Sequence, residues 1–519
     1  MERVAPRQVA YENQLPLAIE SKSQRRKFFP EGSAVYGPNG NNAGLSNIIR
    51  IPINADSLLD CQHSYLQFTI NNTDGGGRTM GLDIGLPHIK RVRIESAGTT
   101  LEDIDNYGKL FGAVLFPAQA TAGAVNEYSA AGMGVAQVGA NIGNLGSGAV
   151  GNNNAGTFQL MADADIVNDA AGAIGDTSAG NESANITQAI KVAINTAMTR
   201  GAGGLIPAFN TRTADAGIGS GHDGPATIGN GASKTFSVCL HTGLLNLEKY
   251  LPLVMMNAGL VLELELDVAN SIGVNSADNA LSWTMSNVVY IAHLIDLQRD
   301  FYDRLRMVME GSGGVLQLTG TTFRSFQSNF AASTADTYNM NIPARMKSIK
   351  SIFFTNTYQP QRYATQRFGI GGAVPNGVSE YQFRVGAVVY PAQPVKVSAT
   401  NKGEAYQELR KAFGSLGSLS HGGVLLNQTT YYPAVNTQHS QASGSLCATP
   451  FGLDFESFPK TTLENGINSA DRSLPINLEI RRADTTGGGA EALAVDIDVF
   501  VMCDAVWYVN LDGSVSVSI

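Results

Sequence analysis

The chain has 519 residues, of which 15 % are charged and 57 are glycine, and its formal net charge is −9. This length exceeds the ~250–300 residues at which one hydrophobic core stops growing, so we expect at least two domains. The negative charge argues against bulk nucleic-acid binding, which needs a positive footprint, and the many turn-forming residues favour an all-β chain.

The four cysteines and the first residues indicate a cellular compartment. Cys61, Cys239, Cys447 and Cys503 form no CxxC pair, and the N-terminus lacks the apolar core of a signal peptide. We therefore expect free thiols in a reducing compartment. No apolar run approaches the ~20 residues of a transmembrane helix. Because the charged fraction lies below the typical ~25 %, part of the surface is expected to lie against other subunits.

Residues 1–44 show no sustained strand or helix period, so we predict an extended N-terminal arm. The arm contains the basic cluster KSQRRKFF at 22–29, which stands out in an acidic chain. A solvated arm is one interpretation of this cluster. The alternative is contact with anionic lipid or a nucleic-acid backbone, which basic and aromatic side chains together suit. The basic residues concerned are Lys22, Arg25, Arg26 and Lys27.

A first series of strands follows the arm. Residues 47–53, 64–72 and 88–96 are bounded by Pro, Gly, Asn or Asp, as short antiparallel strands are. The spacing of apolar residues in TTLEDIDNYGKLFG then predicts a short helix over 99–112. Thr99 or Thr100 is available as its N-cap, and Gly112 as its end.

Residues 117–235 are dominated by Gly, Ala, Asn, Ser and Thr, with one plausible helix at 185–198. A stretch of this length is too long for an ordinary loop, so we expect a disordered insertion or a projecting subdomain. It also holds two carboxylates close together, Asp163 and Asp165.

The segment GLVLELELDVANS at 259–271 alternates leucine with mostly acidic residues, which predicts a half-buried strand. The segment LPINLEIRRADTTGGG at 474–489 alternates in the same manner. The other strands predicted after the insertion are 234–246, 285–298, 313–320, 323–332, 337–357, 379–391, 450–458 and 493–510, with a helix at 401–414.

The two series repeat one order of elements: strands, a helix, a long connection, an alternating strand and a long apolar strand. The helix ends also match, since YGKLFG at 107–112 resembles LRKAFG at 409–414. We therefore predict an internal duplication, with domains at 45–310 and 311–519. About eight strands and long excursions in each favour two tandem eight-stranded jelly-roll β-sandwiches, with immunoglobulin-like sandwiches as the alternative.

The chain offers little catalytic chemistry. IGNGASKT at 228–235 lacks the glycine before lysine of a phosphate-binding loop, and no HExxH, zinc spacing or GxSxG elbow is present. We predict no catalytic, cofactor-binding or metal-binding residues and no cofactor. His293 is expected to be a core histidine. Asp496 and Asp498 share one strand face, which we interpret as solvated, with Ca²⁺ binding or a subunit contact as the alternative.

Four segments together resemble the double jelly-roll major capsid proteins of double-stranded DNA viruses. This lineage includes adenovirus-like and polinton-like viruses, virophages and nucleocytoplasmic large DNA viruses. The resemblance covers nearly the whole chain, except for the insertion. The segments are 46–72, 240–266, 290–305 and 504–519.

The resemblance implies a homotrimer whose six jelly rolls form a pseudo-hexagonal capsomer. Such capsomers would tile an icosahedral shell in the virion, made in the host cytoplasm or nucleus. The expected partners are neighbouring capsomers, penton and minor capsid proteins, and an internal membrane or packaged double-stranded DNA through the arm. The alternative function is an adhesive or carbohydrate-binding β-sandwich protein, which intact disulfides and glycans would favour.

Overall fold

The structure is a computed structural model of the chain. The residues it describes are 21–41, 43–75, 80–81, 86–119, 227–228, 230–274, 282–311, 313–331, 337–359, 362–363, 373–416, 426, 431–432, 449–457, 466–471, 475–483 and 494–519. Most of the predicted insertion, including the predicted helix at 185–198 and the pair Asp163 and Asp165, lies outside these residues.

The first β-sandwich pairs two antiparallel sheets. One has the order β1-β13-β4, with β9 on the far side of β4, and the other has the order β3-β11-β6-β7. The strands are β1 (Ser21–Phe28), β3 (Ile48–Ile53), β4 (Leu58–Asn72), β6 (Ile89–Ser96), β7 (Thr99–Asp105), β9 (Ser233–Val238), β11 (Leu260–Leu266) and β13 (Trp283–Leu297). Short strands accompany them: β2 (Val35–Tyr36), β5 (Met80–Gly81), β8 (Thr227–Ile228), β10 (Leu251–Pro252) and β12 (Gly273–Val274).

The second β-sandwich has the same plan. Its sheets have the orders β14-β21-β16-β19 and β15-β20-β17-β18, and a short extra strand, β22 (Val515–Ser518), pairs with β21. The strands are β14 (Val315–Phe330), β15 (Thr337–Ile342), β16 (Ile349–Tyr358), β17 (Val378–Val385), β18 (Val388–Lys396), β19 (Phe451–Asp454), β20 (Ile476–Arg482) and β21 (Val495–Asn510).

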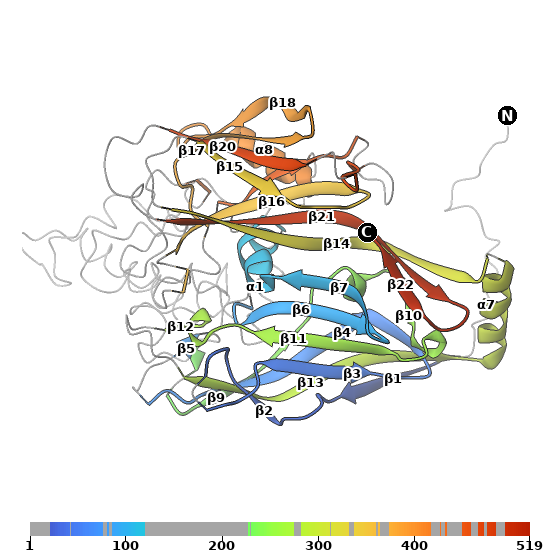
Figure 1. Ribbon diagram of the computed structural model, residues 1–519. Coiled ribbons are helices and arrows are strands. Elements are labelled where there is room, and N and C mark those ends of the chain that lie inside the picture. Colours follow the sequence, from blue (N-terminus) through green and yellow to red (C-terminus); the bar gives the residue numbers. More distant parts are fainter. Residues whose placement is uncertain are drawn as a thin grey trace, which may run out of the picture.

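The two sets of sheets correspond strand by strand in chain order, which confirms the predicted fold of two tandem jelly rolls. The sheet order 1-8-3-6 and 2-7-4-5, counted over the eight principal described strands of either half, is the Greek-key arrangement of a jelly roll. The sandwiches are stacked in Figure 1, with β1 and β13 at one extreme and β18 at the other.

The alternating strands form the core as predicted. Every second residue of β11 is buried, beginning at Leu260, because side chains of a strand point alternately to its two faces. The corresponding strand β20 follows the same rule from Ile476. The segments predicted separately at 313–320 and 323–332 are one continuous strand, β14.

The prediction of an arm over 1–44 is wrong for residues 21–28. These residues form β1, which pairs with β13 along its whole length, from Ser21 opposite Leu297 to Phe28 opposite Tyr290. Backbone hydrogen bonds hold β1 in the sheet while its side chains are exposed, except for Phe28. A strand held in this way needs no apolar alternation, and its sequence therefore shows none.

The helix predicted over 99–112 is also partly wrong. Residues 99–105 form β7, and neither Thr99 nor Thr100 is an N-cap. Leu101, Glu102 and Ile104 are all buried, so both faces of the strand are covered and the alternation is hidden. Helical structure begins at Tyr107 and passes through Gly112: α1 (Tyr107–Lys109), the π-helix η2 (Leu110–Leu115) and α2 (Phe116–Gln119).

The two longer helices differ in how well the sequence predicted them. The helix predicted at 401–414 is α8 (Gly403–Ala412). By contrast, α7 (Arg299–Gly311) was not predicted. It connects β13 to β14 and lies at the opposite end of the molecule from β5 and β12 (Figure 1).

Candidate functional site

The carboxylate of Glu102, on β7, lies fully buried between the two sandwiches. Its Oε1 accepts hydrogen bonds from the Gly243 backbone N–H (2.7 Å) and the Thr322 hydroxyl (2.6 Å), and its Oε2 accepts one from the Leu244 N–H (2.9 Å). Burial raises the pKa of Glu102, and these hydrogen bonds act against the rise. Since Thr322 belongs to β14, this carboxylate joins the first sandwich to the second.

Other polar contacts cross the same junction. Each joins a group near β7 or α1 in the first sandwich to a strand of the second. The contacts are Lys109 Nζ to the Thr357 hydroxyl at 2.6 Å, Arg324 Nη1 to the Asp103 carbonyl at 2.9 Å, and Trp507 Nε1 to the Leu101 carbonyl at 3.2 Å.

The backbone approaches closely at this junction. A Cβ atom on Gly243 would lie 2.1 Å from the Thr321 carbonyl oxygen. Glycine is therefore required there for the loop before β10 to reach β14 and present its N–H to Glu102.

Asp496 and Asp498 do not form the solvated strand face that the sequence analysis preferred. Asp498 is fully buried, and Arg362 Nη1 lies 3.0 Å from its Oδ2 and 3.3 Å from Asp496 Oδ2. Asn329 Nδ2 also donates to Asp496 Oδ1 at 2.8 Å. The two carboxylates raise the pKa of the Arg362 guanidinium further above its ordinary value, against the effect of its burial. An internal cation therefore occupies the place where Ca²⁺ was considered.

Arg362 was missed in the sequence because its partners lie 134 and 136 residues away. Its Nη2 also reaches Asn106 Oδ1 at 3.4 Å, in the first sandwich. The neighbouring Tyr363 hydroxyl lies 3.3 Å from Asp267 Oδ1, again across the junction. This short turn of the second sandwich thus contributes to holding the first.

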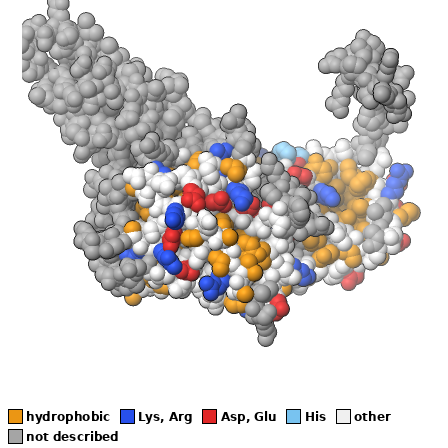
Figure 2. Space-filling view, turned by 90° about the horizontal axis from the view of Figure 1, so that it is seen from above, with side chains coloured by type: hydrophobic (Ala, Val, Ile, Leu, Met, Phe, Trp, Pro, Cys, Tyr) orange, Lys and Arg blue, Asp and Glu red, His pale blue; other side chains and the backbone are white. Residues whose placement is uncertain are grey.

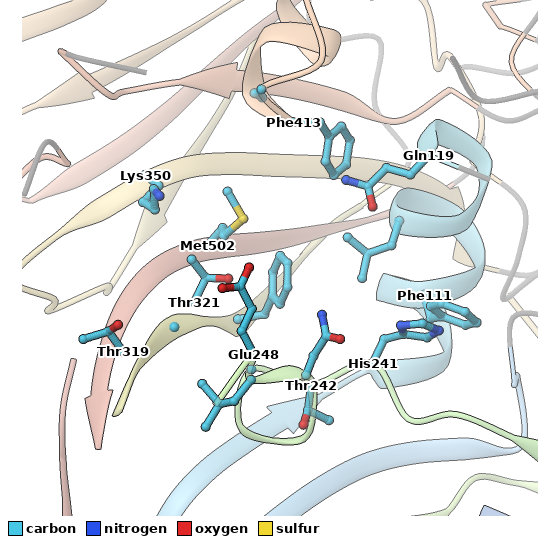
Figure 3. Close-up of a pocket in the computed structure, with 18 of the residues that line it drawn as sticks. Phe111, Gln119, His241, Thr242, Glu248, Thr319, Thr321, Lys350, Phe413 and Met502 are labelled. Atoms are coloured by element: carbon cyan, nitrogen blue, oxygen red, sulfur yellow. The ribbon is translucent and has the colours of Figure 1, made fainter. Parts of the chain in front are cut away.

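A cavity of about 770 Å³ lies at the junction, walled by both sandwiches. Figure 3 shows Phe111 and His241 beside α1 and Phe413 near the end of α8. The Phe111 and His241 rings stack with centroids 4.9 Å apart, and burial lowers the pKa of His241. Across the cavity, Lys350 Nζ lies 2.8 Å from Glu456 Oε1. Phe111 and Phe413, matched in the repeated helix ends, therefore line one cavity.

The basic cluster lies on β1, at the free edge of its sheet. Lys22, Arg25, Arg26 and Lys27 are all exposed. Arg25 Nη2 donates to the Tyr65 hydroxyl at 2.8 Å, while the Arg26 guanidinium lies 5.2 Å from the centre of the Phe28 ring. The structure thus brings the four cationic residues together on one strand beside β13.

The buried histidine of the first sandwich is His88, whereas the predicted His293 is only half-buried. The His88 ring lies between Phe68 and Trp283, with centroids 5.0 and 6.3 Å away. Burial lowers the pKa of His88 to about 3. It is thus a neutral core side chain, which the isolated histidine in LPHIKR did not reveal.

Exposed hydrophobic residues mark two regions. Met307, on α7, is 67 % exposed, and Leu511, after β21, is 49 % exposed. At the opposite extreme, Val388, the first residue of β18, is 53 % exposed. Figure 2, which looks onto the β18 extreme, shows hydrophobic patches among interspersed charges.

Among the described residues, no group of three or more His, Cys, Asp or Glu side chains is arranged to hold a metal ion. No helix within the described ranges is long and apolar enough to cross a membrane. The polar groups assembled by the fold therefore serve contacts between sandwiches.

Comparison with known proteins shows similarity in structure alone. No family model matches the chain, and no curated protein matches it in sequence. The crystal structure of VP54 from the virus PBCV-1 superposes with a TM-score of 0.52 at 10 % identity, covering 98 % of this chain and 99 % of that chain. The Faustovirus major capsid protein gives 0.53 at 8 % identity, with 96 % and 92 % coverage.

A chain of the Sputnik virophage structure gives a TM-score of 0.52 at 10 % identity, covering 100 % of this chain and 93 % of that chain. At such low identities the similarity shows a shared fold. It extends over nearly the whole length of all these chains, so both sandwiches and their relative arrangement are shared.

Proposed function

We propose that the protein is a viral major capsid protein without enzymatic activity. It forms homotrimeric, pseudo-hexagonal capsomers that tile an icosahedral shell enclosing a double-stranded DNA genome. The observation that carries this proposal is the tandem pair of jelly rolls joined by a buried polar junction, in a fold shared with the Faustovirus major capsid protein over 96 % of this chain. We assign residues 45–310, together with β1, to one jelly roll and 311–519 to the other.

The junction supports a role as a rigid building block. A buried carboxylate, a buried lysine and a buried arginine all have partners in the neighbouring sandwich. Leaving any of these polar groups unpaired would be costly, so the two sandwiches are held at one angle. A fixed angle between adjacent jelly rolls is what a regular hexagonal tile requires.

We assign the end of the molecule that carries α7 to the interior of the particle. Lys22 lies opposite Asp296 on β13, two residues before α7 begins, and Arg299, Arg304 and Arg306 are exposed on that helix. Together with the exposed Met307, this end presents cationic and apolar groups. An internal membrane, packaged DNA or minor capsid proteins would meet it through the basic residues, with penton proteins as further partners of the shell.

Electron microscopy of the purified protein and of infected-host lysate tests the proposal. We expect pseudo-hexagonal trimers in solution and icosahedral shells in the lysate, which would place the protein in the virion. Dispersed monomers that bind members of a glycan array would instead support the alternative of a carbohydrate-binding β-sandwich protein. Co-sedimentation with anionic vesicles and with DNA, at low and high salt, tests the inner end.

A charge-reversal variant sharpens the second test. Changing Arg304 and Arg306 to glutamate should abolish salt-sensitive co-sedimentation and leave trimers intact, because both side chains lie on a helix beyond the sheets. Unchanged binding to both anionic partners would mean that the α7 end does not face the particle interior.

A further inference from the structure

The contact between the sandwiches inside one chain provides a template for contacts between chains. Within the chain, the β6–β7 hairpin presents Glu102 to Thr322 on β14. Both side chains are almost completely buried, at 0 % and 1 % exposed. Because the second sandwich repeats the first, it has an equivalent hairpin, and the first sandwich has an equivalent of β14.

The equivalent of the β6–β7 hairpin is the β17–β18 hairpin. Ile51 and Ile342 each precede a proline at the end of corresponding strands, and they anchor the comparison. Reading across the sheet from either isoleucine through paired residues leads to Glu102 in one sandwich and Val388 in the other. The two register series are Ile51–Leu262–Ile94–Glu102 and Ile342–Ile476–Val385–Val388.

The equivalent of β14 is β1. Phe236 on β9 and Phe451 on β19 begin similar alternating strands and anchor this second comparison. Reading across from the next inward-facing residue leads to Phe28 on β1 and Arg324 on β14. The series are Val238–Leu66–Tyr290–Phe28 and Leu453–Ile352–Val501–Arg324. Two positions earlier on the edge strands, Arg26 corresponds to Thr322.

The pair of positions that the junction buries inside the chain is exposed at the two extremes. Val388 is 53 % exposed, and Arg26 is exposed on β1. Their strands lie at opposite ends of the stacked sandwiches in Figure 1. A head on one copy and a tail on the next make a heterologous contact, which closes into a ring when the rotation between copies allows it.

The side chains at the two extremes also suit each other. The Arg26 guanidinium stacks over the Phe28 ring at 5.2 Å, forming a flat surface that is partly apolar. The facing edge strand β18 has the sequence VVYPAQPVK, which contains no acidic residue and only one basic residue. An exposed edge strand this apolar is an association hazard unless another surface covers it.

We propose that the β17–β18 hairpin of one copy docks on β1 and β13 of a second copy of this chain, with Val388 against Arg26. This inference rests on the proposed homotrimer and specifies its interface. The contact replaces the polar in-chain pair by an apolar one, and three such contacts close the ring. The basic residues at the α7 end of β1, headed by Lys22, stay outside this contact.

Cross-linking tests the pairing directly. In a background with Cys239 and Cys447 changed to serine, the double variant R26C/V388C is treated with a bismaleimide. We expect covalent dimers and trimers on denaturing gels, because the two positions lie at opposite extremes of one chain but adjoin between copies. R26C or V388C alone should give no ladder. R26C/K396C is the matched control, since Lys396 is exposed at the other end of β18.

Complementation tests the head-to-tail geometry. V388E and R26E should each raise the protein concentration needed for trimers roughly tenfold or more, measured by mass photometry. An equimolar mixture of V388E and R26E should yield one-to-one dimers without closed trimers, because one intact head still meets one intact tail. Circular dichroism of both variants should match the wild type, since both side chains are exposed.

The outcomes separate this interface from the proposed function. Trimers that persist in V388E and R26E, without an R26C/V388C ladder, would overturn the interface while the capsid assignment stands. A wild-type protein that stays monomeric and forms no shells would overturn both.

Discussion

The helix ends YGKLFG and LRKAFG are nearly the same sequence, yet their lysines lie in opposite environments. Lys109 is 2 % exposed and donates to the Thr357 hydroxyl of the other sandwich. The side chain of Lys411 is 42 % exposed and lies 3.9 Å from Glu408 on its own helix. Sequence similarity between repeats thus reports a shared fold, while burial of a given residue depends on which neighbour covers it.

The long strands β13 and β21 differ in a second way. Continuing the register from Tyr290 and Val501 sets Asn287 of β13 opposite Asp498 of β21 in the comparison. The second sandwich needs Arg362 to neutralise its two buried carboxylates, and the first has an uncharged amide at that position. One copy therefore carries an electrostatic requirement that the other lacks, which variants can expose.

Breaking the ion pair of the second sandwich should have the largest effect. Arg362→Met leaves Asp496 and Asp498 buried without their cation, which should lower the free energy of unfolding by about 3–5 kcal/mol. Urea denaturation measures the change. Arg481→Met is the matched control, because that side chain is 57 % exposed beside Glu380, and it should cost less than about 1 kcal/mol. Equal losses in both variants would contradict a special role for Arg362.

Removing the carboxylate at the junction should rank second. Glu102→Ala leaves the N–H groups of Gly243 and Leu244 without their acceptor, which should cost about 2–3 kcal/mol in urea denaturation. Val388→Ala, at the equivalent exposed position, should stay within about 0.5 kcal/mol for the monomer. A Glu102→Ala variant as stable as the wild type would mean that water or another donor set replaces the carboxylate.

Acid should affect the first sandwich through His88. Its pKa is about 3 when folded and near 6.5 when unfolded, so the unfolded chain binds more protons between these values and stability falls as the pH falls. At pH 5 the loss should be about 2 kcal/mol. His88→Phe should recover this amount at pH 5 and little at pH 7, measured by thermal unfolding. His63→Phe, at an exposed histidine, should leave the pH profile unchanged.

The smallest effect should come from the matched lysines. Lys109→Met removes a buried hydrogen bond to Thr357 and should cost about 1 kcal/mol. Lys411→Met should stay within about 0.5 kcal/mol, because it removes only an exposed ion pair on one helix. Thermal unfolding of both variants measures the difference. Equal costs would show that the two helix ends are covered alike.

Much of the fold follows from the sequence by itself. Period-two alternation in 259–271 and 474–489 predicted β11 and β20, and the repeated order of strands and helix ends predicted two tandem jelly rolls. These signals are local, since a strand with one covered face must alternate apolar and polar residues whatever lies elsewhere in the chain.

Only the tertiary structure decided which polar groups are buried and where the first strand begins. β1 shows no alternation because its backbone bonds to β13 while its side chains stay outside. Glu102 and Asp498 resemble surface carboxylates in sequence, but their partners lie 220 and 136 residues away. Burial of a charge is set by the partner that the fold brings to it, and no local pattern of residue types encodes that partner.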